Sequence, residues 1–260
     1  MKGVSMKKIL KAQEPTELQH YKQTNPQATW SQIRKNKTRY NAVKNQIKKD
    51  QGALCAYCEI DLKESVKSND DFRVEHFHPK NDNSGQTNWA LEWSNLLGCC
   101  HGGSERNVVD AKQRFTSSAE RHCDVPKKGR NLSGIILSPL QIPAFPLLFD
   151  FERFTGEMSI NTMACSNANI SINIAESTIR ELCLNATVLK IHRKDVLNSL
   201  NQEINILIGN GKTITEAMDY TVKAVLRKDS NGNLPAFFST IRSYLKSAAE
   251  THLAVIGYNG

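Results

Sequence analysis

The spacing of five cysteines constrains the fold of this chain more than any other feature of its sequence. Cys55 and Cys58 form a Cys-x-x-Cys pair, and in a tight turn this spacing lets two thiolates face one metal ion. The other two ligands of a tetrahedral site would come from three later cysteines, Cys99, Cys100 and Cys123. We therefore expect a structural Zn²⁺ ion that ties together a region with few apolar residues.

The composition is that of a globular protein of 260 residues, 39% of them hydrophobic, enough for a core in one large domain or two small ones. No apolar run approaches the roughly 20 residues needed to cross a bilayer, and the first residues lack the apolar core of a signal peptide. We expect a cytoplasmic location without membrane contact, where clustered cysteines bind metal more often than they form disulfides. Free buried thiols are the alternative, which fits Cys165 and Cys183 best because both lie outside the cluster.

A net charge of +8 favours polyanionic partners such as nucleic acid, although many proteins with this charge never bind one. The charge is dense in 30–50, where apolar residues recur at helical spacing and lysines and arginines fill most other positions. This pattern predicts one amphipathic helix with a basic outer face. That face is either the solvated side of a helix that packs against the zinc region or a contact surface for phosphate groups.

An acid and a histidine, Glu75 and His76, stand side by side in a segment that predicts a strand leading into a loop over 70–80. His76 would lie at the strand end, where side chains are commonly presented to a substrate. In a regular strand Glu75 and His76 point to opposite faces, so both reach one site only if the backbone bends there. His78 alternates with His76 and is either catalytic or, like Lys80, a phosphate contact.

The remaining segments predict a polar arm, a hairpin and a helical C-terminal region. Residues 1–28 indicate an extended arm, 89–93 a short strand or extended segment, and 147–158 a β-hairpin with its turn at Thr155-Gly156. Further on, the pattern predicts a helix from Asn173 to Gly209, a second that begins at a capping box of Thr213 and Glu216, and a third with Pro235 in its first turn. The predicted domains are 1–50 (arm and basic helix), 51–132 (zinc-supported core) and 133–260 (hairpin and helices).

The order of four motifs resembles that of the HNH endonucleases: Cys55-x-x-Cys58, Glu75-His76 followed by Pro79, Asn95-Leu96, and a late pair of cysteines. The more detailed similarity is to the HNH endonucleases of retron and Septu anti-phage defence systems, and it is carried by 51–59, 74–80, 93–97 and 122–124. The likeness extends more weakly over most of the chain. It implies an α+β fold in which a zinc-supported ββα-metal (HNH) nuclease core is followed by a mainly helical C-terminal region.

The resemblance also implies the zinc ligands, because the motif has a cysteine five residues after Asn95 and its final part resumes late in the chain. The implied set is Cys55, Cys58, Cys100 and Cys123, with an insertion over 101–120 and with Cys99 as the competitor of Cys100.

For catalysis, the resemblance implies His76 as the general base and Glu75 and Asp124 as ligands of a catalytic Mg²⁺ or Mn²⁺. Asn95 would follow the second strand and orient the imidazole or its loop. Two positions depart from the common pattern, since Glu75 replaces an aspartate and Asp124 stands where histidine or asparagine is usual. His101 is therefore the competitor of Asp124. A histidine that only supports the fold is the alternative for His76.

The implied substrate contacts are His78, Lys80 and Lys127, and the implied target is DNA or RNA. As partners the resemblance implies a Septu-type ATPase and, in a retron complex, a reverse transcriptase with its DNA–RNA product. Two alternatives stay open: a non-catalytic, zinc-stabilised nucleic-acid-binding or scaffold module, which would not need the acid and histidine pair, and a stand-alone restriction-type HNH nuclease.

Overall fold

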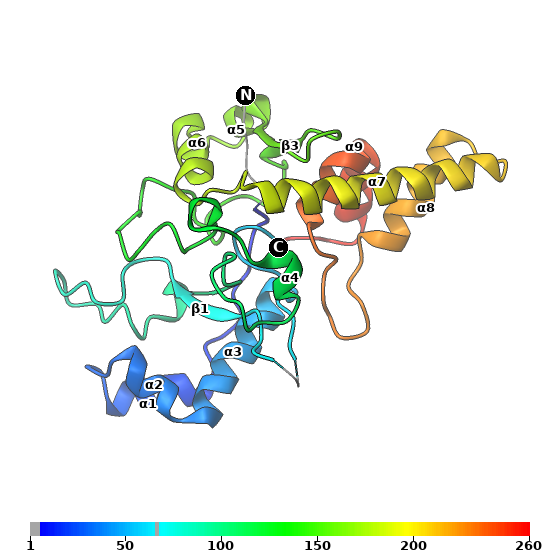
Figure 1. Ribbon diagram of the computed structural model, residues 1–260. Helices are drawn as coiled ribbons and strands as arrows, with labels where there is room; N and C mark the ends of the chain where they lie inside the picture. The colour runs from blue at the N-terminus through cyan, green and yellow to red at the C-terminus, as the bar shows by residue number, and fades with distance from the viewer. Residues whose placement is uncertain (1–5, 66–67) are drawn as a thin grey trace.

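The computed structural model describes residues 6–65 and 68–260 and contains helices and two small antiparallel sheets. In chain order the elements are α1 (Thr16–Thr24), α2 (Trp30–Lys35), α3 (Lys37–Gln51), β1 (Arg73–His76), the 3₁₀ helix η1 (Trp93–Asn95), β2 (Leu96–Cys99), α4 (Ala111–Arg114), η2 (Ser118–Glu120), β3 (Phe149–Phe151), β4 (Met158–Ile160), α5 (Thr162–Asn167), α6 (Ile172–Glu181), α7 (Thr187–Gly209), α8 (Ile214–Val225) and α9 (Phe238–Val255). Figure 1 shows β1 with α1, α2 and α3 at one end of the molecule, and α7 running with α8 to the other.

The N-terminal segment is not the extended arm that the sequence suggested. It contains the helix α1, and Met6 and Ile9 are buried in the core. The backbone N–H of Ile9 donates to the carbonyl of Pro139 (2.8 Å), so the start of the chain is fixed to a segment 130 residues later in the sequence. Residues 1–5 of the predicted arm lie outside the described residues.

Lys7 is buried in this segment, with 4% of its surface exposed, and its Nζ donates to the carbonyl of Lys8 (3.2 Å). Burial lowers the pKa of Lys7 from 10.5 to about 8. The unfolded chain therefore holds this proton more tightly, so the lysine's contribution to stability is present above pH 10.5 and is lost as pH falls through about 8.

Replacing Lys7 with methionine should raise the free energy of unfolding at neutral pH by about 1–3 kcal/mol, since it removes this cost of burial. Urea unfolding of the parent and of Lys7→Met at about pH 7 and about pH 10 measures the effect, which should shrink at the higher pH. Lys49→Met, at an exposed position, serves as the control. A variant that is less stable than the parent at neutral pH would contradict the assignment.

The basic segment forms two helices rather than the one that was predicted. Asn36 ends α2 and caps α3, where its Oδ1 accepts from the backbone N–H of Arg39 (3.0 Å). Asparagine is among the preferred N-cap residues because its side chain satisfies a free N–H in the first turn. The apolar stripe is as expected on α3, where Val43 and Ile47 are fully buried.

The sheet of β1 and β2 is regular, and its two faces have different neighbours. Glu75 pairs with Leu97 and His76 with Leu96, and the same register continues to the other end of β1. Gly98 shows what covers the His76 face, because a Cβ on this glycine would lie 2.8 Å from the side chain of Ile47 in α3. The side chain of Gln51 bonds to both backbone groups of Gly98, accepting at 2.7 Å and donating at 2.9 Å. Helix α3 therefore lies directly on this sheet.

One expectation about this region is wrong. Residues 89–91 form turns that lead into η1, where the side chain of Glu92 accepts from the N–H of Ser94, so Asn95 precedes β2 instead of following the second strand. The helix that packs on the sheet is α3, which comes before the strands, whereas the segment after β2 contains only the short α4 and η2 before β3. The mixed helix and strand class is as predicted.

The predicted hairpin is present as β3 and β4, with Phe149 paired to Ile160. Its turn lies at Thr155-Gly156, as expected. Gly156 has φ +69°, and a Cβ there would lie 1.9 Å from the carbonyl oxygen of Lys190. Only glycine fits this position, because the turn lies against the backbone of α7.

The long helix predicted from Asn173 is broken. The cap of helix α6 is Ser171 and not Asn173, the helix ends at Glu181, and α7 starts only at Thr187. In the break, the Oδ1 of Asn185 accepts from the backbone N–H of Met158 (3.1 Å), so the chain is held against β4. This long-range contact lies where the helix is interrupted, although the apolar stripe in the sequence is continuous.

The last two helices differ in how well their starts were predicted. The capping box of Thr213 and Glu216 is present at the start of α8. Helix α9 begins at Phe238, so Pro235 lies before the helix and not in its first turn. Helices α7, α8 and α9 share a second apolar cluster, separate from the one that runs from Met6 to Phe237. Among the described residues, none of the helices is both long and apolar enough to span a membrane.

Candidate functional site

Four buried cysteines converge on one point. The Sγ atoms of Cys55, Cys58, Cys100 and Cys123 all lie within 4.8 Å of one another, with single separations of 3.6 and 3.7 Å. Burial opposes ionisation of Cys55, but hydrogen bonds from the thiols of Cys100 and Cys123 outweigh it and hold the pKa of Cys55 well below the ordinary thiol value. Four thiols, one of them readily ionised, form a donor set that could bind Zn²⁺.

The local structure explains how these ligands meet. Cys55 and Cys58 occupy the turn after α3, Cys100 follows β2 directly, and Cys123 has φ +60° in the loop after η2. Cys99 pairs with Arg73 inside the sheet and is not part of the four-cysteine group. Burial raises the pKa of the Cys99 thiol well above its ordinary value. The four gathered cysteines are the set that the resemblance implied.

A pair of largely buried carboxylates lies on the face of β1 opposite His76. Lys127 is 3% exposed and donates to a carboxylate oxygen of Glu75, and Arg73 forms an ion pair with Asp124. Burial, followed by the nearby charge of Asp124, raises the pKa of Glu75 to about 8 against the opposing effect of Lys127. Two carboxylates that repel each other offer the oxygen ligands that Mg²⁺ and Mn²⁺ prefer, so this pair fits a divalent cation. Lys127, an expected substrate contact, is engaged with Glu75.

His101, the competitor of Asp124, is engaged elsewhere. Its backbone N–H and its Nδ1 both lie against Oδ1 of Asp71 (2.7 and 3.1 Å), and Asp71 also accepts from Arg114 (2.8 Å). These contacts favour Asp124 as the companion of Glu75.

His76 lies on the opposite face of β1 from Glu75, with 6% of its surface exposed. Its ring meets the edge of Trp30, with centroids 4.8 Å apart, and its Nε2 lies 3.3 Å from the carbonyl oxygen of Ala90. Because a carbonyl only accepts, Nε2 carries the proton and Nδ1 has the free lone pair. Burial lowers the pKa of His76 to about 4, so the ring is neutral at cellular pH. The expected bend between Glu75 and His76 is absent, since both residues pair regularly with β2.

Asn95 holds the loop that follows β1. Its Oδ1 accepts from the backbone N–H of His78 (2.6 Å), and its Nδ2 donates to the carbonyls of His78 (3.0 Å) and Trp89 (2.8 Å). Of the two tasks that the sequence suggested, the structure places Asn95 on the loop and not on the imidazole of His76.

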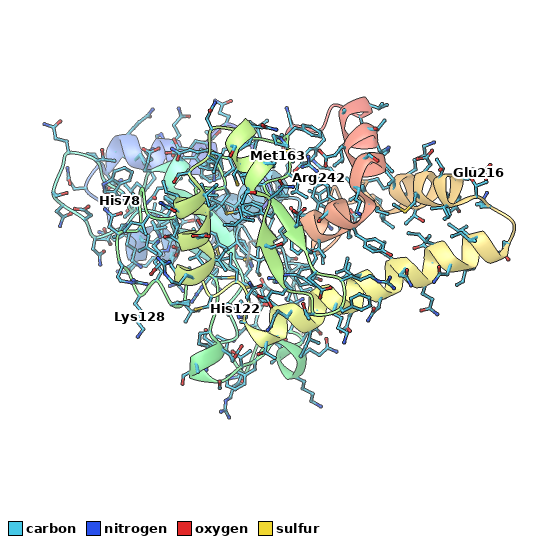
Figure 2. The ribbon with its side chains drawn as sticks, turned by 90° about the horizontal axis from the view of Figure 1, so that it is seen from above. His78, His122, Lys128, Met163, Glu216 and Arg242 are labelled. Carbon is cyan, nitrogen blue, oxygen red and sulfur yellow. The ribbon has the colours of Figure 1, made fainter. Side chains whose placement is uncertain are left out.

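Both ring nitrogens of His78 are engaged. Nε2 lies 2.6 Å from a carboxylate oxygen of Asp82 and Nδ1 lies 3.3 Å from the hydroxyl of Ser133, while the ring lies against Trp89 with centroids 4.1 Å apart. Figure 2 shows His78 near the end of the molecule opposite Glu216. Lys80 is exposed. Asp82, Ser133 and Trp89 were not predicted as partners of His78; among them only Asp82, four residues after His78, has a sequence spacing that could have indicated the contact.

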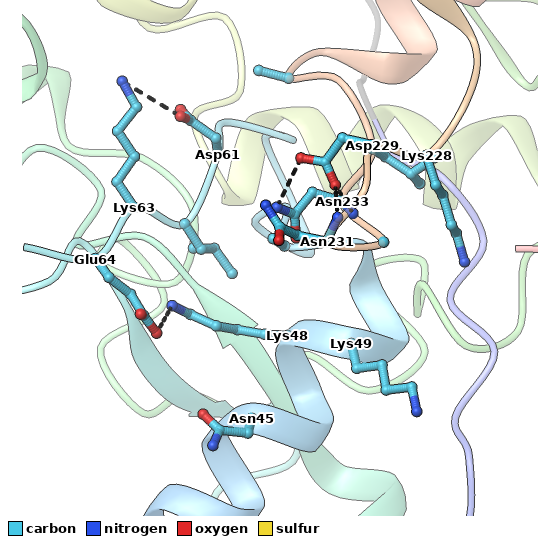
Figure 3. A pocket seen from close by; sticks show the side chains of 15 residues that line it. Asn45, Lys48, Lys49, Asp61, Lys63, Glu64, Lys228, Asp229, Asn231 and Asn233 are labelled. Atoms are coloured by element: carbon cyan, nitrogen blue, oxygen red, sulfur yellow. Dashed lines mark hydrogen bonds and ion pairs between the residues drawn. The ribbon is translucent and has the colours of Figure 1, made fainter.

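The basic face of α3 borders a cavity of about 800 Å³, shown in Figure 3, which is lined by lysines from three segments. Lys48 is paired with Glu64 (2.6 Å), and Lys63 lies 3.5 Å from Asp61. Acidic residues outside the helix thus offset part of the positive face. Helix α3 packs on the sheet through its apolar side. Contact of its basic face with phosphate groups stays a proposal.

Comparison with known proteins gives one strong similarity. No protein-family model matches the sequence. The chain is 35% identical over 215 aligned residues to "Retron Ec83 putative HNH endonuclease" of Escherichia coli, and the alignment covers 75% of this chain and 81% of that protein.

Proposed function

Because this chain belongs to the retron-associated HNH endonucleases, we propose that it hydrolyses phosphodiester bonds of nucleic acid in a retron-associated defence system. The observation that carries the proposal is the proximity of Asp124, next to a cysteine of the four-cysteine cluster, to Glu75 of β1. In this proposal the thiolates of Cys55, Cys58, Cys100 and Cys123 are the ligands of a structural Zn²⁺.

Glu75 and Asp124 would hold the catalytic Mg²⁺ or Mn²⁺. A cation there would stabilise the oxygen that leaves the scissile phosphate and would acidify a bound water. Lys127 and Arg73, which contact the same carboxylates, keep positive charge at this place and would attract the phosphate backbone. Lys80 is exposed beyond the strand end and would add a contact to phosphate.

His76 would take the proton from the attacking water. Its Nε2 is fixed by Ala90, so the ring is oriented and Nδ1 accepts, whereas His78 has partners at both nitrogens. Glu75 and His76 lie on opposite faces of β1, but His76 is the last residue of the strand. The regular strand keeps the two side chains apart, so the proposal requires the end of β1 to bend when a phosphate binds there.

The proposal also includes the partners of the enzyme. A Septu-type ATPase and, in a retron complex, a reverse transcriptase with its DNA–RNA product would be the partners. Exposed lysines of α3 would contact the nucleic-acid backbone. Activity of the isolated chain on plain duplex DNA would favour a stand-alone nuclease instead, and binding without any cleavage in the presence of partners would favour a scaffold.

The test is to replace His76 with alanine and to measure cleavage of labelled DNA and RNA in Mg²⁺ or Mn²⁺, with and without the partner proteins. We expect the rate to fall by about 100-fold or more, the usual contribution of a general base. His20→Ala, at an exposed position on α1, is the matched control and should cleave like the parent. If folded His76→Ala protein also cleaved like the parent, His76 would not be the base.

A further inference from the structure

A cavity of about 620 Å³ opens next to the end of β1. Phe77 and His78, the two residues after His76, form part of its wall, and Asn95 also lines it. The cavity is therefore built on the loop that Asn95 fixes to the strand end. Its volume lies within the range of small-ligand sites, about 300–1,000 Å³.

The chemistry of the wall selects the kind of ligand. The lining includes the aromatic pair of Trp89 and His78 and aliphatic side chains such as Ile170 and Ile174. It also includes Ser133 and other small polar groups. Among the described residues that line it, no lysine, arginine, aspartate or glutamate is present. Such a wall suits a flat, uncharged group with a few hydrogen-bonding atoms, and it does not suit a phosphate.

We propose that this cavity binds an unpaired nucleobase of the substrate and that the enzyme acts on single-stranded nucleic acid. The inference rests on the proposed function, because it is the phosphate at the end of β1 that brings a neighbouring base to the cavity. Aromatic side chains that stack on bases are the common means of binding single strands, since every base has a flat π-face. A base inside a duplex is paired and stacked, and it cannot enter without leaving the helix.

A base bound in this cavity would also fix the position of its neighbouring phosphate. Trp89 and His78 are joined to Asn95 through the backbone carbonyls of both residues. A base stacked on this aromatic pair would therefore be held at a fixed place relative to β1, and so would the adjoining phosphate.

Binding measurements test this without depending on cleavage. The full-length, zinc-loaded protein, in buffer without Mg²⁺ or Mn²⁺ so that no hydrolysis occurs, is titrated into short fluorescent single strands of DNA and RNA and into the matching duplex. We expect single strands to bind more tightly than the duplex. Trp89→Leu should weaken single-strand binding by about 5- to 100-fold, the effect of losing one stacked base, and should leave duplex binding unchanged.

Trp89→Phe keeps an aromatic ring and should retain most of the affinity, and Phe154→Leu, at an exposed aromatic 72% accessible in the β3–β4 turn, should bind like the parent. Ile174→Trp puts a large side chain into the cavity and should weaken single-strand binding even if Trp89→Leu folds poorly. Unchanged single-strand binding in both Trp89→Leu and Ile174→Trp would overturn the inference. Cleavage that persists in those variants would leave the nuclease proposal intact. A parent protein that binds single strands but does not cleave them would count against the nuclease proposal and not against the base-binding cavity.

Discussion

Cys100→Ser protein will lose its zinc and unfold at much lower temperature than the parent, whereas Cys99→Ser protein will keep the metal. The two cysteines are adjacent, but only Cys100 belongs to the four-cysteine group, and Cys99 lies in the sheet opposite Arg73. Structural Zn²⁺ contributes about 10–16 kcal/mol of binding free energy in small zinc domains, as much as the whole stability of a typical domain. Losing one thiolate of this site should therefore be among the most destabilising single changes in the chain.

Metal analysis of the purified proteins and thermal unfolding measure this result, and a chelator added to the parent should reproduce the Cys100→Ser behaviour. Cys165→Ser is the control for loss of a buried thiol, because Cys165 is fully buried outside the group. Equal zinc content in the Cys99 and Cys100 variants would show that the ligand set is wrong.

Glu75→Gln should reduce cleavage by at least about 1,000-fold, equivalent to about 4 kcal/mol in the barrier, while the protein stays folded and zinc-loaded. The loss follows because the amide cannot hold a divalent cation beside Asp124. Folding should tolerate the change, since it removes one of two carboxylates that repel each other, and Lys127 keeps its bond to the carbonyl of His76.

The measurement is the cleavage rate as a function of Mg²⁺ concentration, together with thermal unfolding. Asp124→Asn should behave like Glu75→Gln. Asp70→Asn breaks another carboxylate–lysine pair, with Lys44, outside the proposed site, and should cleave normally. Parent-like rates in both Glu75→Gln and Asp124→Asn would exclude this pair as the catalytic metal site.

Features that depend on local spacing were predictable from the sequence. The Cys-x-x-Cys pair, the Thr213 and Glu216 capping box and the Thr155-Gly156 turn are each set by a few neighbouring residues. The resemblance, and not the spacing alone, selected Cys100 over Cys99.

Features that depend on distant partners were not predictable. Met6 and Ile9 give no periodic signal, and their burial becomes apparent only when the chain folds back to Pro139. The burial of His76 is of the same kind, because it arises from Trp30, 46 positions earlier in the chain. Neither contact has a local pattern that a sequence could display.

The bonds from Gln51 to Gly98 also bear on self-association. A sheet of two strands has two edges, and an uncovered edge is a template on which another chain can add a strand. At the centre of β2 the outward N–H and carbonyl of Gly98 are both taken by the Gln51 amide, and the carbonyl also accepts from the N–H of Ala56 (2.9 Å). The Gln51 side chain and the backbone of Ala56 together close this edge to strand addition, and the N–H of Gly98 depends on Gln51 for its partner.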